Sequence, residues 1–356
     1  MSKQALCIKV PKVHGEEAVV FSNKLKIVDK QLEIQRTTEF VYIPLARDLL
    51  KDELKMLQEK IPTIEIQTYK FPERKKRVVS FFELLQGKLP PHLLANLPRA
   101  IDFVGDIAIA EIPPELAEYK GVIGEAILKA HKNVRTVLAK VGAVSGTYRL
   151  REFVVIAGEP KTETIHKEHG CQFRVDLTKA YFSPRLSYEH KRVASLVMEG
   201  ETVVDLFTGV GPFAILIAKT HGKVKVYAVD VNPYAVEFLR ENVRLNRLIS
   251  KVYPLLGDAR QVVEEKLARL ADRVIMNLPE KAIEYVDAAC KTLKPEGGVI
   301  HFYSFINASN SLENMKLHFA EAVQKCGRKV EKIFFARFVR ETAPYEWQAV
   351  IDAKIH

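Results

Sequence analysis

The stretch Val203-Val-Asp-Leu-Phe-Thr-Gly-Val-Gly-Pro-Phe213 decides the fold of the second half of the chain. Its apolar beginning predicts a buried strand over Thr202–Phe207, which runs through Gly209-Val-Gly211 directly into a helix. Glycines let the backbone approach a ligand closely, and doubly wound α/β folds bind nucleotides where their strands end. The stretch therefore predicts a nucleotide site at the carboxyl edge of a sheet.

Strands and helices alternate around this stretch, from Asp176 to the last residue. Such alternation implies a mostly parallel sheet with helices on both faces, and we assign residues 176–356 to one α/β domain. The further strands are predicted at Val224–Val229, Val252–Leu256, Arg273–Met276, Gly298–Phe305, Lys329–Arg337 and Gln348–Ile355, and the helices at Phe213–Lys219, Pro233–Leu245 and about Ile283–Thr292.

Two smaller α+β domains precede this one, at residues 1–72 and 78–175. In the first, strands are predicted at Leu6–Val10, Leu32–Thr37, Glu39–Leu45 and Ile64–Tyr69, and helices at Glu16–Leu25 and Asp48–Lys60. In the second, helical segments are predicted at Ser80–Leu97 and from Pro113 to about Lys132, and strands at Ile101–Ile112, Thr136–Val144, Glu152–Ala157 and Gln172–Leu177. The basic stretch Lys70–Arg77 between them is interpreted as a linker, either a solvated loop or a direct RNA contact.

Composition limits the class of protein. The 54 Lys and Arg against 44 Asp and Glu give a net charge of +10, which favours a polyanionic partner. No apolar run is long enough for a membrane span, and Met1–Lys12 lacks the pattern of a secretory signal. The cysteines at 7, 171, 290 and 326 lie far apart, which indicates reduced thiols in a cytoplasmic protein and no structural zinc.

Three acids follow three successive predicted strands. The glycine pattern alone also fits the dinucleotide fingerprint of dehydrogenases. Asp205 lies four residues before Gly209, where a carboxylate can meet a cationic ammonium but would repel a pyrophosphate. Asp230 ends the second strand, placed to accept both hydroxyls of a ribose, and Asp258 or its neighbouring backbone can bind an adenine amino group. An isolated acid at a strand end is usually a helix cap, but three beside one glycine turn favour a ligand site.

Residues 200–305 therefore resemble the class I S-adenosylmethionine-dependent methyltransferases. The resemblance implies a Rossmann-like fold and S-adenosylmethionine as the cofactor. The residues expected to bind the cofactor are Asp205, Leu206, Phe207, Gly209, Gly211, Pro212, Asp230, Val231, Asp258, Ala259 and Asn277, and His190 upstream is expected to touch it as well.

After the fourth strand comes Met276-Asn-Leu-Pro-Glu280, which is similar to the Asn-Pro-Pro motif of methyltransferases that modify base nitrogens. Asn277 or a backbone carbonyl here can bond the edge of a base while Pro279 stiffens the loop. A plain Asn-x-Pro turn at the end of a strand is the alternative.

Three segments closely resemble one narrower family, the archaeal and eukaryal tRNA (guanine-37-N1)-methyltransferases. They are Gly146–Glu152, Thr164–Gly170 and Lys179-Ala-Tyr-Phe-Ser-Pro-Arg-Leu-Ser-Tyr-Glu-His-Lys-Arg192, and the resemblance extends over nearly the whole chain, to Ala343-Pro344. It implies methylation of guanine N1 beside the anticodon, with Glu189 as general base and Arg149 holding the charge that develops on O6. It also implies that Tyr181 packs on the cofactor or the base, and that Asn277 orients the guanine edge.

Each of these roles has a structural alternative. Glu189 could be a helix-face acid paired with Lys191 or Arg192, Arg151 could replace Arg149, and Tyr181 could be a core residue. His166 and His169 are interpreted as turn residues, since two histidines without further ligands make no metal site.

The partner that the resemblance implies is tRNA, with residues 1–70 docking on the outer corner of the folded molecule. Separately, we expect the chain to act as a monomer. Methylation of the tricyclic wyosine precursor at the same tRNA position remains an alternative activity. A dehydrogenase and a noncatalytic RNA-binding module are the alternatives from other classes.

Overall fold

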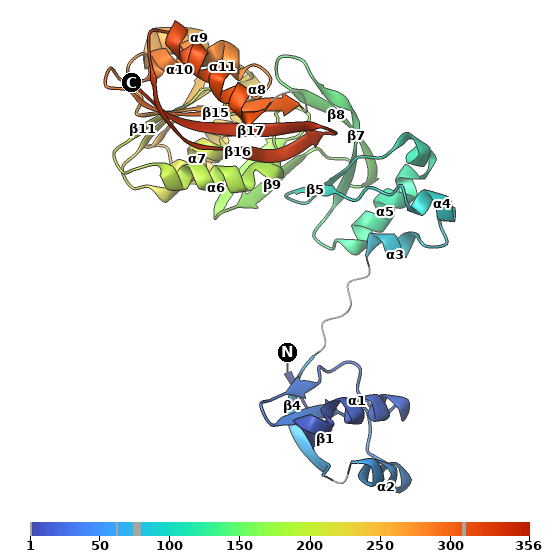
Figure 1. Cartoon of the computed structure of the whole chain (residues 1–356). Helices are drawn as coiled ribbons and strands as arrows, with labels where there is room; N and C mark the ends of the chain where they lie inside the picture. Colours follow the sequence, from blue (N-terminus) through green and yellow to red (C-terminus); the bar gives the residue numbers. More distant parts are fainter. Residues whose placement is uncertain (1, 62, 74–79, 308–310) are drawn as a thin grey trace. The chain divides into compact units, whose positions relative to one another are not determined.

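The computed structural model describes residues 2–61, 63–73, 80–307 and 311–356. The chain divides into two compact units, Met1–Val78 and Val79–His356 (Figure 1). The predicted boundary at 175/176 falls inside the second unit. Of the predicted linker, residues 74–77 lie outside the described residues.

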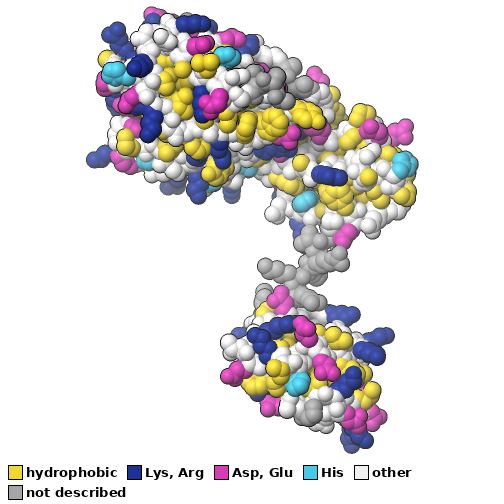
Figure 2. Space-filling view, viewed as in Figure 1, with side chains coloured by type: hydrophobic (Ala, Val, Ile, Leu, Met, Phe, Trp, Pro, Cys, Tyr) yellow, Lys and Arg dark blue, Asp and Glu magenta, His cyan; other side chains and the backbone are white. Residues whose placement is uncertain are grey.

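The first unit is a four-stranded antiparallel sheet with two helices. The elements are β1 (Ser2–Pro11), the 3-10 turn η1 (Lys12–His14), α1 (Gly15–Lys24), β2 (Gln35–Arg36), β3 (Phe40–Pro44), α2 (Lys51–Lys60) and β4 (Glu65–Pro72), and the strand order is β2-β3-β1-β4. Strand residues such as Ile8 pack against Ala18 of α1 and Leu57 of α2, while Cys7 and Phe71 belong to a second, smaller cluster. The unit therefore has a core of its own. On its visible face in Figure 2, basic and acidic side chains are interspersed.

The second unit begins with a mixed sheet of order β5-β6-β7-β8. Its elements are α3 (Phe81–Leu85), α4 (Pro91–Leu94), β5 (Ile101–Val104), β6 (Ile107–Ala110), η2 (Pro114–Tyr119), α5 (Lys120–Ala130), β7 (Thr136–Ser145) and β8 (Leu150–Gly158). The single strand predicted over 101–112 is wrong, because the chain reverses at Gly105. This glycine has φ of 56°, and a Cβ there would lie 2.1 Å from Oγ1 of Thr164.

A two-stranded hairpin follows, formed by β9 (Glu163–Glu168) and β10 (Cys171–Asp176). Strand β9 was not predicted. The interpretation of His166 as a turn residue is wrong, because it lies on β9, whereas His169 does lie in the turn.

The rest of the second unit carries a seven-stranded sheet of order β13-β12-β11-β14-β15-β17-β16. The first five of these strands are parallel and β17 is antiparallel to both neighbours, so the predicted mostly parallel sheet is confirmed. The strands are β11 (Thr202–Asp205), β12 (Lys225–Asp230), β13 (Val252–Leu256), β14 (Arg273–Met276), β15 (Gly298–Asn307), β16 (Val330–Ala343) and β17 (Glu346–Ile355). The helices and turns are η3 (Pro184–Leu186), α6 (Ser187–Leu196), α7 (Pro212–Thr220), α8 (Pro233–Leu245), α9 (Ala259–Val262), the π turn η4 (Val263–Leu267), η5 (Ala282–Tyr285), α10 (Val286–Thr292) and α11 (Leu312–Lys325).

Helices cover both faces of this sheet. Successive residues of a strand point to opposite faces, so Val203 packs with α6, α7 and α8 while Val204 packs with α10 and α11. The sheet is thus buried on both sides, and its carboxyl edge is where loops reach a ligand.

Candidate active site

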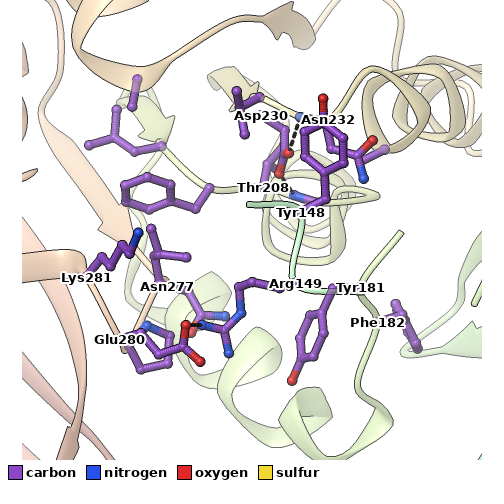
Figure 3. A pocket seen from close by; sticks show the side chains of 18 of the residues that line it. Tyr148, Arg149, Tyr181, Phe182, Thr208, Asp230, Asn232, Asn277, Glu280 and Lys281 are labelled. Atoms are coloured by element: carbon purple, nitrogen blue, oxygen red, sulfur yellow. Dashed lines mark hydrogen bonds and ion pairs between the residues drawn. The ribbon is translucent and has the colours of Figure 1, made fainter. Parts of the chain in front are cut away.

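A cavity lies where β11, β12, β13 and β14 end (Figure 3). Most of the predicted site residues line it: Arg149, Tyr181, His190, Leu206, Phe207, Gly209, Pro212, Asp230, Val231, Asp258, Ala259, Asn277 and Pro279. Glu189, Asp205 and Gly211 are not among its lining residues, and each is described below.

The glycine turn is fixed by Asp230. The backbone N–H of Gly209 donates to Oδ2 of Asp230 over 2.7 Å, and the N–H of Asn232 donates to Oδ1 over 2.9 Å. Asn232 in turn caps α8 by accepting from the N–H of Tyr234. Gly211 lies beneath the turn with φ of 93°, and a Cβ there would come within 2.3 Å of Leu239, so this position requires glycine for packing.

Asp205 ends β11 as a completely buried carboxylate. Its Oδ2 has no hydrogen-bond partner, and burial raises the pKa of this group to about 7. A buried acid without a partner is costly, and its ionised form would be stabilised by a cation at this strand end. An α-amino group fits that requirement, directly or through water.

At the end of β13, Asp258 caps α9. Its Oδ1 accepts from the N–H of Arg260 over 2.9 Å, and the hydroxyl of Tyr285 lies 3.4 Å from Oδ2. The Tyr285 ring meets Phe207 edge to face with centroids 5.1 Å apart, which gives this end of the cavity an aromatic wall. Such a wall beside polar groups suits a flat purine.

Arg149 enters the cavity from the turn that joins β7 to β8. It has φ of 56°, a conformation uncommon for a residue with a side chain, and its Nη1 lies 2.9 Å from Oε2 of Glu280 (Figure 3). Its guanidinium lies over the Tyr181 ring at 5.6 Å. Arg151 donates instead to the carbonyl of Gly142 and does not line this cavity, so geometry favours Arg149 over Arg151.

Glu189 is fully buried on α6, away from the cavity. Its Oε2 accepts from Nε of Arg192 and from the hydroxyl of Tyr303, both at 2.9 Å, and its Oε1 accepts from Arg337. The alternative pairing with Arg192 is therefore present, and Arg337 is a second partner that the sequence analysis missed. In this arrangement the carboxylate does not reach a ligand in the cavity.

The neighbouring His190 does face the cavity. Its Nδ1 lies 2.7 Å from Oε1 of Glu168. Burial alone would raise the pKa of Glu168, but the neighbouring His166 and the hydrogen-bonded His190 lower it to about 2. The ionised Glu168 thus fixes the His190 ring against Phe213, which it meets edge to face at 4.6 Å.

Several residues that the sequence analysis missed also line the cavity. They are Tyr148, Thr208, Asn232, Leu278, Glu280, Lys281, Tyr285, Arg340 and Gln348, among others. The last two come from β16 and β17, and the one available signal was a glutamine within the apolar run that ends the chain. A second cavity shares Arg149, Tyr181 and Arg340 with the first and adds the cations Lys140, Arg151 and Arg185 beside the acids Asp102, Glu341 and Glu346, so its lining carries both signs of charge.

No group of His, Cys, Asp and Glu in the described part of the chain could hold a metal ion. Among the same residues, no helix is both long and apolar enough to cross a membrane.

The sheet is mostly parallel, a glycine turn follows one of its strands, and acids lie at three strand ends, one of them buried with an unpaired oxygen. Together these features define a class I S-adenosylmethionine-dependent methyltransferase. Comparisons with known proteins agree. Residues 164–332 match the model of the TRM5/TYW2 methyltransferase domain, and residues 81–162 match that of the TYW2 N-terminal domain.

Similarity to individual proteins indicates a narrower family than the domain models do. The chain is 38% identical over 352 residues to the tRNA (guanine(37)-N(1))-methyltransferase Trm5b of Pyrococcus abyssi, covering 98% of this chain and 99% of the relative. It is 37% identical to the tRNA 4-demethylwyosine(37)-methyltransferase Taw21 of Saccharolobus solfataricus, over 72% of this chain and 94% of the relative. A solved complex of aTrm5 with tRNALeu superposes with a TM-score of 0.72 at 33% identity, covering 99% and 100% of the two chains. The chain therefore belongs to the tRNA (guanine(37)-N(1))-methyltransferase family, and the resemblance drawn from its motifs is confirmed.

Proposed function

We propose that this protein transfers a methyl group from S-adenosylmethionine to N1 of guanine 37 in tRNA. The observation that carries the proposal is full-length similarity to enzymes named for this reaction. It is joined by a cavity lined with the polar and aromatic side chains that the cofactor requires. The relative solved with tRNALeu and the net charge of +10 support tRNA as the partner.

When bound, S-adenosylmethionine supplies an electrophilic methyl group on a sulfonium. Asp205 would hold its ammonium and Asp230 its ribose hydroxyls, since Asp230 keeps free lone pairs besides the two N–H groups that it accepts. Asp258 and the backbone of Ala259 would hold the adenine amino group. The side chains of Leu206, Phe207, Pro212 and Val231 would enclose the remainder.

Proton removal is the chemical problem on the substrate side, because guanine N1 carries a proton at neutral pH. Arg149 would stabilise the negative charge that develops on O6, and Asn277 and Pro279 would orient the base edge. Tyr181 would stack on the base or the cofactor. A charge stabiliser of this kind contributes ~10²–10³ in rate.

Glu189 remains our proposed general base, worth ~10²–10⁴ in rate, with one condition that the geometry adds. Its carboxylate must first leave one of its arginines. Arg337 is the partner that can move, because its side chain is 35% exposed whereas that of Arg192 is 11% exposed. We propose direct transfer without a covalent enzyme intermediate, with which the lack of a cysteine in the loop Asn277–Glu280 agrees.

Methylation of the wyosine precursor is the second candidate, because the chain is also 37% identical to an enzyme named for it. That match covers 72% of the chain, whereas the two archaeal guanine-37 enzymes match over 98% and 99% of it, which favours guanine N1. We further propose that the protein works as a monomer in the cytoplasm, where its four free cysteines would stay reduced.

One experiment tests the reaction. Purified protein is incubated with unmodified tRNA and labelled S-adenosylmethionine, and mass spectrometry of the digested nucleosides locates the methyl. We expect 1-methylguanosine at position 37, and none in a tRNA that carries adenosine there. Binding of NADH in place of S-adenosylmethionine would favour a dehydrogenase, and cofactor binding without transfer a noncatalytic RNA-binding module.

A further inference from the structure

A chain of hydrogen bonds runs from β16 through β17 to the loop after β14. Arg340 and Gln348 are paired across the two strands. Nε of Arg340 donates to Oε1 of Gln348 over 2.9 Å, and Nε2 of Gln348 donates to Oδ1 of Asn277 over 2.9 Å. Gln348 is 1% exposed, so water does not compete for these bonds.

Which group donates and which accepts in these hydrogen bonds follows from chemistry alone. A guanidinium has five donors and no acceptor, so the Gln348 atom facing Arg340 must be the oxygen. The amino group of Gln348 then faces Asn277 and must meet an acceptor. The side-chain oxygen of Asn277 is therefore committed to Gln348, which leaves its Nδ2 on the other side of the amide.

Arg340 is itself held firmly. Its Nη1 donates to Oγ of Ser183 over 2.7 Å and its Nη2 to the hydroxyl of Tyr181 over 3.0 Å. The guanidinium therefore cannot turn away and let the Gln348 amide reverse. Among the described residues, Nδ2 of Asn277 donates no hydrogen bond, and Asn277 lines the cavity, so this donor is left for a ligand.

We propose that Gln348 is a positioning residue that makes the site selective for a purine with an oxygen at position 6. By fixing the Asn277 amide it presents a donor to the base, and Arg149 in the same cavity is also only a donor. Guanine O6 accepts from donors, whereas the 6-amino group of adenine would meet them as a third donor. This inference rests on the proposed function, since it concerns the base that the cavity receives.

Gln348→Glu tests the proposal most directly. The introduced carboxylate keeps the size of the side chain and still accepts from Arg340, but it can no longer donate to Asn277. The Asn277 amide should then reverse and turn its oxygen toward the base. Gln348→Met removes both hydrogen bonds without adding charge, and Gln324→Glu on the exposed side of α11 is the control for the charge change.

The readout is discrimination between bases. Single-turnover methyl transfer is measured on tRNA carrying guanine, hypoxanthine or 2-aminopurine at position 37; the first two have O6 and the third lacks it. We expect Gln348→Glu to slow the two O6 bases ~10- to 100-fold while 2-aminopurine changes little, with a smaller loss in discrimination for Gln348→Met. Gln324→Glu should behave as wild type. A merely structural role for Gln348 would slow all three bases equally.

Equal losses on the three bases, or unchanged discrimination in Gln348→Met, would overturn the proposal. Binding affinities of the same three tRNAs give the same comparison without catalysis, with a smaller preference for O6 expected in both Gln348 variants. Wild-type protein that transfers no methyl to guanine 37 would refute the proposed function instead, and the binding comparison would still decide the role of Gln348.

Discussion

Asp205 is a carboxylate that the fold buries completely while leaving one of its oxygens without a partner. Burial is the main reason why its pKa is raised from 3.8 to about 7, and the nearby Asp230 raises it further. A group of this kind favours the folded state at pH values below 4, and that contribution is lost as the pH rises toward 7. A bound ammonium would offset the free-energy cost of ionising the Asp205 carboxyl.

Cofactor affinity should therefore depend on pH through this residue. Binding an ammonium requires the ionised carboxylate, so the affinity for S-adenosylmethionine should fall by up to ~10-fold per pH unit below about 7. Asp205→Asn should bind weakly at every pH, with a flat profile. Calorimetric titrations between roughly pH 5.5 and 7.5 measure both. A wild-type affinity that is constant over this range would show that Asp205 does not meet the ammonium.

Glu189 has two possible roles, as general base and as the buried partner of two arginines. The substitution Glu189→Gln removes both at once. Breaking a buried ion pair typically costs ~3–5 kcal/mol, so we expect a clear drop in melting temperature in either case. If Glu189 is also the base, single-turnover transfer at saturating tRNA should fall ~10²-fold or more at a temperature where the variant is folded.

Glu201 supplies the matched control. It is a buried carboxylate that accepts from Nε of Arg273 over 2.8 Å and does not line the cavity. Glu201→Gln should lose stability comparably and keep its rate. Similar rates in the two variants would leave Glu189 only a structural role.

At the scale of elements, the start of α7 depends on Gly211. Gly211→Ala would place a Cβ 2.3 Å from Leu239 on α8 at a φ of 93°, which adds overpacking of ~1–3 kcal/mol to a backbone cost of ~1–2 kcal/mol. Because the turn carries the cofactor cavity, S-adenosylmethionine affinity should fall as well.

Gly327→Ala separates the two costs. Gly327 has φ of 75° with no atom within 4 Å of a built Cβ, so its variant should lose only the backbone part and bind the cofactor normally. Denaturant unfolding and cofactor titration of both variants check this. Equal losses of stability would mean that the Leu239 side chain moves aside without cost.

Helices and strands were predicted accurately where the local sequence marks their ends. Helix α8 and strands β13 and β14 were predicted with the bounds that they have, because caps or uninterrupted apolar runs mark them. The bend at Gly105 was missed because a lone glycine between two apolar runs reads as one strand. Strand β9 was missed because its alternation is weak, with charged residues at both ends and in its middle.

Residues around the cavity were predicted where they lie in one short segment, and they were missed where their position depends on pairing between distant segments. The strand-end acids follow from local motifs. Gln348 and Arg340 reach the cavity only because β17 lies between β15 and β16 in the sheet. Sequence periodicity does not reveal this order of strands. The pairing of Glu189 with Arg337, 148 residues away, was hidden for the same reason.

At the scale of the whole molecule, the first unit has a separate core, so its removal should leave residues 79–356 folded. All residues that line the cavity at the carboxyl edge of the sheet belong to the second unit. A variant lacking residues 1–78 should therefore keep the wild-type affinity for S-adenosylmethionine. If the first unit docks on the outer corner of tRNA, the same variant should bind full-length tRNA more weakly and with a shallower dependence on salt, because fewer phosphates are neutralised.

An isolated anticodon stem-loop separates docking from a damaged active site, because it lacks the outer corner. The full chain and the truncated variant should bind and methylate this small RNA equally, whereas full-length tRNA should distinguish them. Binding measured at several salt concentrations, with cofactor affinity as the test of folding, gives the comparison. Equal affinity of both proteins for full-length tRNA would remove the docking role from the first unit. A loss of equal size on the stem-loop would instead place its contacts on the anticodon arm, beside the base that the cavity receives.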